Sequence, residues 1–171
     1  ESSDDNQPSW SKDGEHLAFT TDRDGNTEIY TMSKDGTNLT NRTNNANDDK
    51  YPQWSPVGDI ILFSTNRFNL SESQEELALL DTANSTTTQL TSNGARSIEG
   101  TWSPDGTTVA FSSNVDGDFD IYTIDISGEN QLKVIDLPGD QKTPKWTING
   151  SAIVFESQHN GSQDIYSIKK D

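Results

Sequence analysis

The sequence predicts an all-β fold, a four-bladed β-propeller that forms a single domain over residues 1–171. The first observation is that the four tryptophans recur at intervals of 44, 48 and 44 residues, as Trp10, Trp54, Trp102 and Trp146. The second is a phenylalanine nine residues after each of them, in the series Phe19, Phe63, Phe111 and Phe155. The third is the presence of short strand-like runs and glycine turns within each repeat. Repeats of about 40–45 residues with several short strands are typical of propeller blades.

The first repeat, residues 8–43, contains the four strands expected of one blade. Residues 8–11 are expected to form the inner strand and residues 16–20 the second, joined by a Lys-Asp-Gly turn. Residues 28–32 and 37–43 are expected to form the third and outer strands. Glycine accepts a positive φ, so the Asp-Gly pairs between these runs suit hairpin turns.

The remaining blades are expected at about residues 52–91, 100–135 and 144–171. The tyrosine of the third strand recurs as Tyr30, Tyr122 and Tyr166, and we expect Leu77 to take its place in the second blade. The sequence stops after the third strand of the fourth repeat. We therefore expect the last blade to lack its outer strand.

The amino-acid composition excludes several classes of partner and chemistry. There are 28 acidic and 12 basic residues, a net charge of −16, and 29% hydrophobic residues. So few hydrophobic residues suit the thin layers between repeats better than one deep core. The negative charge argues against nucleic acid and anionic membrane surfaces as partners. No apolar run approaches the ~20 residues that a membrane span needs, and the absence of cysteine excludes disulfides and thiol chemistry.

The chain begins at Glu1, and its only methionine is Met32. We therefore expect that residues preceding Glu1 were removed, either as a secretory signal or by truncation of a longer protein. With a composition rich in Asn, Ser, Thr and Asp, this favours a secreted, extracellular or periplasmic location.

One set of motifs recurs along essentially the whole chain. It comprises Trp102-Ser103-Pro104-Asp105-Gly106, Ala110-Phe111, Asp120-Ile121-Tyr122 and Gln89-Leu90-Thr91. These motifs resemble the WD40-like repeat of the TolB type. The resemblance implies a β-propeller and, more weakly, a platform for recognising proteins, because a fold does not determine a function. Propellers of this family usually have six blades, so a chain with four leaves the closure of the ring in doubt.

A charged position precedes each tryptophan by six residues and should lie at one rim of the central channel. It is occupied by Asp4, Asp48, Arg96 and Asp140. A ring of carboxylates there would hold a cation. The alternative is that each side chain binds backbone of the adjacent blade and ties the blades together.

The turn between the second and third strands alternates oxygen-bearing side chains, as in the first half of a calcium loop. The candidate ligands are Asp22, Asp24, Asn26 and Glu28 in the first repeat and Asn114, Asp116, Asp118 and Asp120 in the third. The sequence predicts weak Ca²⁺ binding. The alternative is an ordinary β-turn in which Asp and Asn accept backbone N–H groups.

Enzyme motifs are sparse. The two histidines, His16 and His159, lie at different positions of the repeat, and there is no Gly-x-Ser-x-Gly, His-Glu-x-x-His or phosphate-loop motif. We expect a non-enzymatic, extracellular structural or binding propeller with no catalytic residues. The alternatives are a periplasmic recognition platform that binds a protein partner, and the propeller part of a larger hydrolase.

The missing outer strand suggests how the protein associates. The third strand of the last blade, Asp164-Ile165-Tyr166-Ser167-Ile168, should present an unpaired edge, and such an edge is a template for another chain. Addition of a strand from the N-terminus of a second copy would join unlike surfaces. Head-to-tail contacts of this kind produce rings or filaments, so we expect a homo-oligomer.

Overall fold

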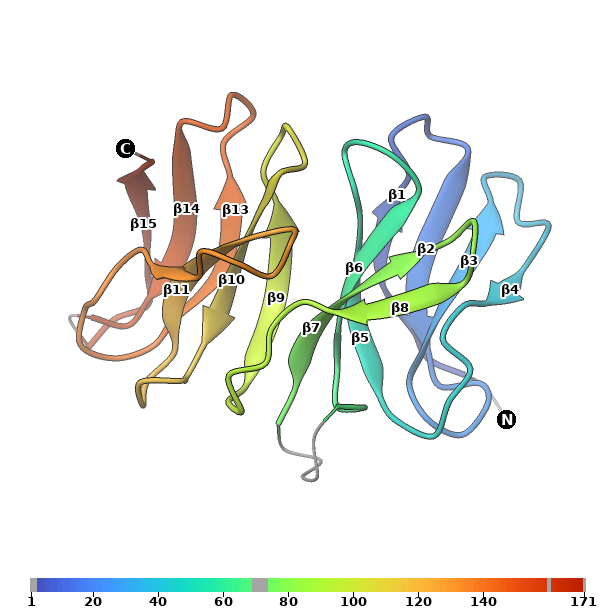
Figure 1. Ribbon diagram of the computed structural model, residues 1–171, viewed down its shortest axis with the longest axis horizontal. Helices are drawn as coiled ribbons and strands as arrows, with labels where there is room; N and C mark the ends of the chain where they lie inside the picture. The colour runs from blue at the N-terminus through green and yellow to red at the C-terminus, as the bar shows by residue number, and fades with distance from the viewer. Residues whose placement is uncertain (1–2, 69–73, 160, 171) are drawn as a thin grey trace.

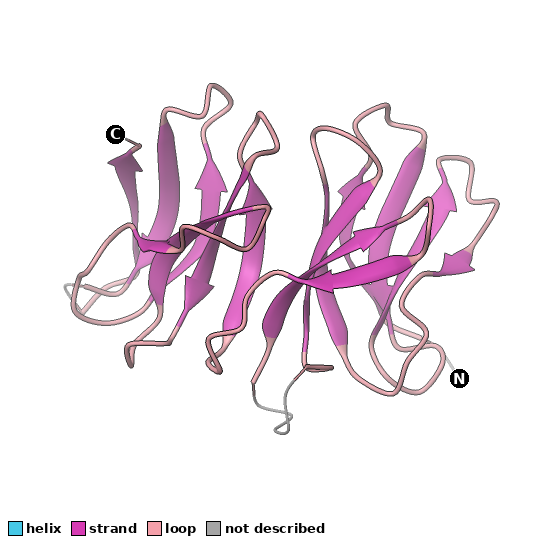
Figure 2. Ribbon diagram, viewed as in Figure 1, coloured by secondary structure: helices cyan, strands magenta, loops and turns pink. Residues whose placement is uncertain are grey.

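The computed structural model describes residues 3–68, 74–159 and 161–170, and within these ranges it consists of strands and loops without a helix (Figures 1 and 2). Four antiparallel sheets follow one another along the chain, each built from consecutive strands. Blade 1 contains β1 (Asp5–Trp10), β2 (His16–Thr21), β3 (Glu28–Ser33) and β4 (Thr40–Asn41); blade 2 contains β5 (Asp49–Trp54), β6 (Ile60–Thr65), β7 (Glu76–Asp81) and β8 (Thr86–Gln89); blade 3 contains β9 (Ser97–Trp102), β10 (Thr108–Ser113), β11 (Asp120–Asp125) and β12 (Leu132–Lys133); and blade 4 contains β13 (Gln141–Trp146), β14 (Ala152–Ser157) and β15 (Asp164–Lys169).

The four-bladed arrangement and the missing outer strand of blade 4 are both confirmed: within the described ranges, the sheet β13-β14-β15 has three strands where the others have four. The blades form an open arc. No strand of blade 1 packs closely against a strand of blade 4 in the described part of the chain, and Figure 1 shows the two blades at opposite ends of the molecule. Each end of the arc therefore leaves one blade face uncovered.

The inner strands carry a feature that was not predicted. In every blade the pairing of the inner strand with the second strand shifts register once, at a residue with positive φ. These bulge residues stand three positions before each tryptophan and are Gln7 (φ 54), Tyr51 (φ 57), Glu99 (φ 57) and Thr143 (φ 53). A β-bulge inserts a residue into a strand and bends it without ending the pairing. Asp5 and Asn6 therefore pair with β2 on the far side of the bulge, and β1 begins at Asp5, three residues before the predicted start at residue 8.

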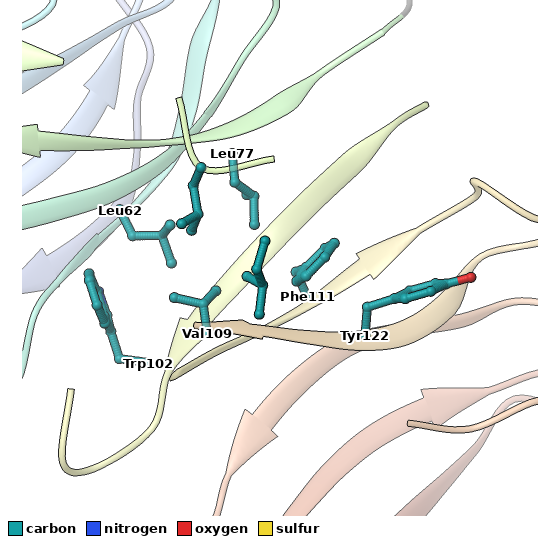
Figure 3. Packing of buried hydrophobic residues seen from close by; sticks show 8 residues of the cluster. Leu62, Leu77, Trp102, Val109, Phe111 and Tyr122 are labelled. Atoms are coloured by element: carbon teal, nitrogen blue, oxygen red, sulfur yellow. The ribbon is translucent and has the colours of Figure 1, made fainter. Parts of the chain in front are cut away.

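The core lies between blades rather than within one of them. Between blades 2 and 3, Leu62 and Leu77 pack against Trp102, Val109 and Phe111 (Figure 3). Equivalent clusters join blade 1 to blade 2 and blade 3 to blade 4. Each pair of blades thus buries one thin apolar layer, as the low hydrophobic content predicted.

Two expectations about aromatic positions were wrong. Ala78, not Leu77, lies opposite Phe63 in β7, at the position where Tyr30 and Tyr122 face their phenylalanines. Successive residues of a strand point to opposite faces, so Leu77, which occupies the position of Ile29 and Ile121, packs against blade 3. The repeat would also place Trp10 between two blades like the later tryptophans, but Trp10 is 55% exposed, because no blade lies against this face in the described part of the chain.

The outer strands are shorter than predicted, with β4 and β12 only two residues long. No helix in the described part of the chain is long and apolar enough to span a bilayer.

Candidate functional site

The rim residues predicted from the sequence lie immediately before each inner strand, and three of them connect neighbouring blades. The Asp48 carboxylate accepts a hydrogen bond from the Thr27 amide at 3.0 Å, and Asp140 accepts one from the Phe119 amide at 3.2 Å. Arg96 instead makes an ion pair with Glu75, with 2.6 Å between Nε and Oε2. Each contact ties a blade to the third strand of the blade before it. Asp48 and Asp140 thus bind backbone of the preceding blade, as the blade-tying alternative describes, whereas Arg96 binds a side chain there.

Asp4, the first rim residue, occupies the uncovered end of the arc. Its backbone amide donates to Asp22 at 2.9 Å within the same blade. Because blades 1 and 4 lie at opposite ends, the four rim positions follow an open arc rather than a closed ring.

The turn residues of blade 1 are engaged with the protein itself. Asp24 accepts hydrogen bonds from the Tyr30 hydroxyl and, at 3.0 Å, from Asn41. Glu28 is buried, accepts the Thr43 hydroxyl and the Asn45 amide, and is also bonded to Asn26. These bonds hold the turn against the outer strand and the loop that leads to blade 2.

In blade 3 a lysine takes the position of a cation among the carboxylates. The ammonium of Lys133 lies 2.8 Å from Asp120, 3.0 Å from Asp136 and 3.4 Å from Asp116. These groups and Asp118 line a hollow of about 400 Å³. Asn114, the remaining candidate, accepts a bond from the Arg96 amide at 2.8 Å.

Among the described residues, no three His, Cys, Asp or Glu side chains are grouped so as to hold a metal ion. The predicted ligands lie in two separate turns, and the contacts above engage only part of their oxygens. Oδ1 of Asp120 is buried and has no hydrogen-bond partner in the described part of the chain.

A buried acid begins the third strand of blades 1 to 3, at Glu28, Glu76 and Asp120. Glu76 accepts the Thr91 hydroxyl and, at 3.0 Å, the Gly94 amide. Burial raises the pKa of Glu28 and of Glu76 above the ordinary value, although these hydrogen bonds oppose the shift. Glu28 and Glu76 fasten their strands to the chain that enters the next blade, whereas Asp120 pairs with Lys133 on the outer strand of its own blade.

The predicted association edge is open along β15. In blades 1 to 3 the backbone of the corresponding residue is occupied by the outer strand: the carbonyls of Ile29, Leu77 and Ile121 each accept an amide at 2.8 Å. Ile165 is the counterpart in blade 4, where no outer strand follows within the described chain. The strand runs from Asp164 through Tyr166 and Ser167 to Ile168 and is largely exposed along its length.

The bulge residues link the inner strands of successive blades. Gln7 accepts the Tyr51 amide and Glu99 accepts the Thr143 amide, both at 2.9 Å. Tyr51, Glu99 and Thr143 also line a hollow of about 220 Å³ with Lys145. Reasoning from the sequence did not single out this position, since it carries four different residue types. The only available signal was its constant distance from the tryptophan.

The sequence matches a known family of β-propellers. The family profile described as "TolB beta propeller domain" matches residues 1–97 and 68–171, which together cover the chain. No curated protein matches the sequence.

Solved structures share the fold. TolB from Acinetobacter baumannii aligns with a TM-score of 0.82 at 24% identity over 95% of this chain and 40% of that one. A putative TolB from Agrobacterium tumefaciens aligns with a TM-score of 0.84 at 20% identity over 96% of this chain and 61% of that one. A puromycin-hydrolyzing peptidase from Mycobacterium tuberculosis aligns with a TM-score of 0.76 at 16% identity over 99% of this chain and 29% of that one. At these identities the likeness establishes the fold alone, and the chain spans less than two thirds of the length of each of these proteins.

Proposed function

The chain belongs to the TolB β-propeller domain family, and from this premise we propose that it is a non-enzymatic binding propeller that associates with further copies of itself. The location we propose is extracellular or periplasmic, as the composition suggested. One observation carries the proposal, namely the three-stranded sheet of blade 4.

The open edge of β15 suits the addition of a strand. At Leu77 in blade 2, the amide donates to the Thr91 hydroxyl at 2.9 Å and the carbonyl accepts the Leu90 amide at 2.8 Å. The equivalent groups of Ile165 face the side where blade 4 has no outer strand in the described chain. An extended segment from the N-terminus of a second copy would satisfy them by β-augmentation. Donor and acceptor differ in this contact, so it would propagate head-to-tail.

Proline substitution tests strand addition. Ser167→Pro removes an amide from β15, and a residue without an N–H cannot donate to a ladder. We expect it to convert oligomers into monomers in analytical ultracentrifugation while the circular dichroism spectrum stays that of intact blades. Ser167→Ala is the matched control, because it removes the hydroxyl and keeps the amide. A wild-type protein that sediments as a monomer at high concentration would refute the proposal.

A second candidate function is a recognition platform for a different protein, supported by the similarity to the TolB structures. Affinity capture from the source organism distinguishes the two. A single heterologous partner recovered at stoichiometric amounts favours recognition, and recovery of the protein alone favours self-association.

A third candidate is the propeller part of a larger hydrolase, supported by the alignment with the puromycin-hydrolyzing peptidase over 29% of that chain. The complete reading frame decides this question. Several hundred further residues with a Ser-Asp-His set would favour the hydrolase.

A further inference from the structure

The same repeat positions pack together at each interface between blades, and several of these positions are exposed at the two ends of the arc. We call the face of a blade that bears the tryptophan and the phenylalanine its leading face, and the opposite face its trailing face. At each internal junction the trailing face of one blade packs against the leading face of the next. Blade 2 presents Leu62 and Leu77 from its trailing face, and blade 3 receives them on Trp102, Val109 and Phe111 (Figure 3).

The same positions are used at the other junctions. Ala18 and Ile29 of blade 1 pack in one cluster with Ile61 and Phe63 of blade 2. Ala110 and Ile121 of blade 3 pack in another with Ile153 and Phe155 of blade 4. The contact is thus a property of the repeat and not of one pair of blades.

A second contact accompanies it at the first hairpin turn. Pro56 and Val57 of blade 2 pack on Gly106 of blade 3, where an added Cβ would lie only 2.3 Å from Val57 Cγ2. At the next junction an added Cβ on Gly150 would lie 3.4 Å from Cδ of Pro104. The turn of each of these blades therefore rests on the glycine of the turn that follows it.

The trailing face of blade 4 has the residues for both contacts but is uncovered. Ile165, the counterpart of Leu77 and Ile121, is 69% exposed, whereas those two are fully buried. Ile148 stands in the turn at the position of Pro56 and Pro104, and it is 99% exposed.

The leading face of blade 1 is exposed at its tryptophan, whereas Phe19 and Tyr30 are buried with the Arg23 guanidinium over both rings. Trp10 is 55% exposed, and its counterpart Trp102 only 8%. Leu17, Phe19, Met32 and Leu39 line an apolar hollow of about 270 Å³ on this face. Nothing lies within 4 Å of a Cβ placed on Gly14, the counterpart of Gly106 and Gly150, and the same holds for Gly58 at the junction of blades 1 and 2, so among the described junctions this turn contact is made at the second and third.

We propose that the trailing face of blade 4 docks on the leading face of blade 1 of a second copy of this chain, and so continues the blade-to-blade packing between molecules. Ile165 would cover the hollow beside Trp10 and Leu17, and Ile148 would rest on Gly14. The two end faces carry the same positions of the repeat as the three junctions already formed, so this docking would continue the internal interfaces. The inference rests on the self-association proposed above, but it places the contact on blade faces rather than on the edge of β15.

The hydrogen bonds made just before each inner strand could also form between two copies. Within the molecule the Asp48 carboxylate accepts the Thr27 amide, and the Asp49 amide donates to the Thr27 carbonyl at 2.8 Å. Asp4 and Asp5 are the counterparts at the free leading face. Their partner in a second copy would be the backbone of Gln163, which occupies the position of Thr27 in blade 4.

Two variants disable one face each. Trp10→Glu places a carboxylate on the leading face, and Ile165→Asp combined with Ile148→Asp does so on the trailing face. We expect each to weaken association by about tenfold or more, because docking would bury an unpaired charge. The matched control is Leu132→Asp, since Leu132 is an equally apolar residue, 64% exposed, on the outer strand of blade 3. Circular dichroism and melting temperature check that every variant is folded.

Mixing the variants gives a result specific to this arrangement. Trp10→Glu leaves the trailing face unchanged, and the Ile148→Asp, Ile165→Asp double variant leaves the leading face unchanged. An equimolar mixture should form a dimer that does not grow, measured by sedimentation velocity, while each variant alone is monomeric.

The outcomes separate the inference from strand addition. If the face variants dissociate the oligomer and Ser167→Pro does not, docking stands and strand addition is wrong. If only Ser167→Pro dissociates it, or if the mixture stays monomeric, the docking of faces is overturned. A wild-type chain that is monomeric at every concentration overturns both.

Discussion

Trp10 and Trp102 occupy one position of the repeat but differ in their surroundings. Trp102 is 8% exposed between blades 2 and 3, and its Nε1 donates to the Gln53 carbonyl at 3.0 Å. We expect Trp102→Ala to lower the free energy of unfolding by about 3–5 kcal/mol, because it leaves a large cavity. The control Trp10→Ala should cost about 1 kcal/mol or less, since Trp10 lies on an uncovered face. Urea titration followed by circular dichroism measures both, and equal losses would contradict the packing described.

Asp105 shows how one turn responds to acid. Its carboxylate accepts the Ser103 hydroxyl at 2.6 Å and the Thr107 amide at 3.1 Å. These hydrogen bonds lower the pKa of Asp105 to about 2. A carboxyl whose folded pKa is depressed contributes stability above its unfolded pKa of about 3.9, and that contribution is lost as the pH falls through the folded pKa.

The stability difference between wild type and Asp105→Ala should therefore be constant above about pH 5 and shrink between about pH 4 and pH 2. Urea titrations across this range measure it. A difference that persists unchanged at pH 2 would mean that the turn does not depend on the ionised carboxylate.

At the scale of single elements, the buried acid of β7 links the third strand to the chain that enters blade 3. Thr91→Val removes the hydroxyl that donates to Glu76. We expect a loss of about 1–3 kcal/mol, because the buried carboxylate of Glu76 and the buried amide of Leu77 each lose a partner. Thr88→Val is the control, since Thr88 is exposed on the neighbouring strand β8.

The pH dependence of this loss has a definite sign. Burial already raises the pKa of Glu76, and the Thr91 bond opposes the rise. A carboxyl with a raised folded pKa loses its contribution to stability as the pH increases. Thr91→Val should raise that pKa further, so its cost should be greater at pH 7 than at pH 4. An equal cost at both pH values would show that Glu76 is not involved.

Calcium binding by the turns remains a proposal, and Lys133 gives it a sharper test. Millimolar Ca²⁺ should raise the melting temperature of the wild type only slightly relative to EDTA, by mass action on weak sites. Lys133→Ala removes the ammonium that lies among Asp116, Asp120 and Asp136. We expect its response to calcium to be larger. Asp24→Asn combined with Asp116→Asn should abolish any response. Identical melting curves with Ca²⁺ and EDTA in all variants would show that the turns do not bind calcium.

The spacing of the aromatic residues predicted the blades because each tryptophan and phenylalanine belongs to an interface that repeats. Finer features could not be predicted for physical reasons. A bulge at residues as different as Gln7 and Glu99 depends on backbone strain rather than on residue type. The face on which Leu77 lies depends on the pairing of β6 with β7, which places Ala78 and not Leu77 opposite Phe63. The contacts of the turn acids depend on partners as far along the sequence as Lys133.

For the whole molecule, the sequence indicated which strand would be missing, but not that the two end faces would be complementary. That conclusion requires the three internal junctions, because they show which positions are buried when two blades meet. The exposure of Trp10 and Ile165 has meaning only by comparison with Trp102 and Ile121.

The charge of the molecule predicts how salt acts on association. The chain carries a net charge of −16 at pH 7, so two copies repel each other at low ionic strength. The contacts proposed for Ile148, Ile165 and Trp10 are apolar, although Lys145 and Glu156 lie beside Ile165, and apolar burial does not depend on ion pairs. The range of electrostatic repulsion falls from about 10 Å at 0.1 M salt to about 3 Å at 1 M. Raising NaCl from about 0.05 to about 0.5 M should therefore strengthen self-association in sedimentation experiments. Leu132→Asp should respond as the wild type does, whereas Trp10→Glu should stay monomeric throughout. Dissociation of the wild type by salt would instead indicate an interface held together by ion pairs, and would count against the docking of blade faces.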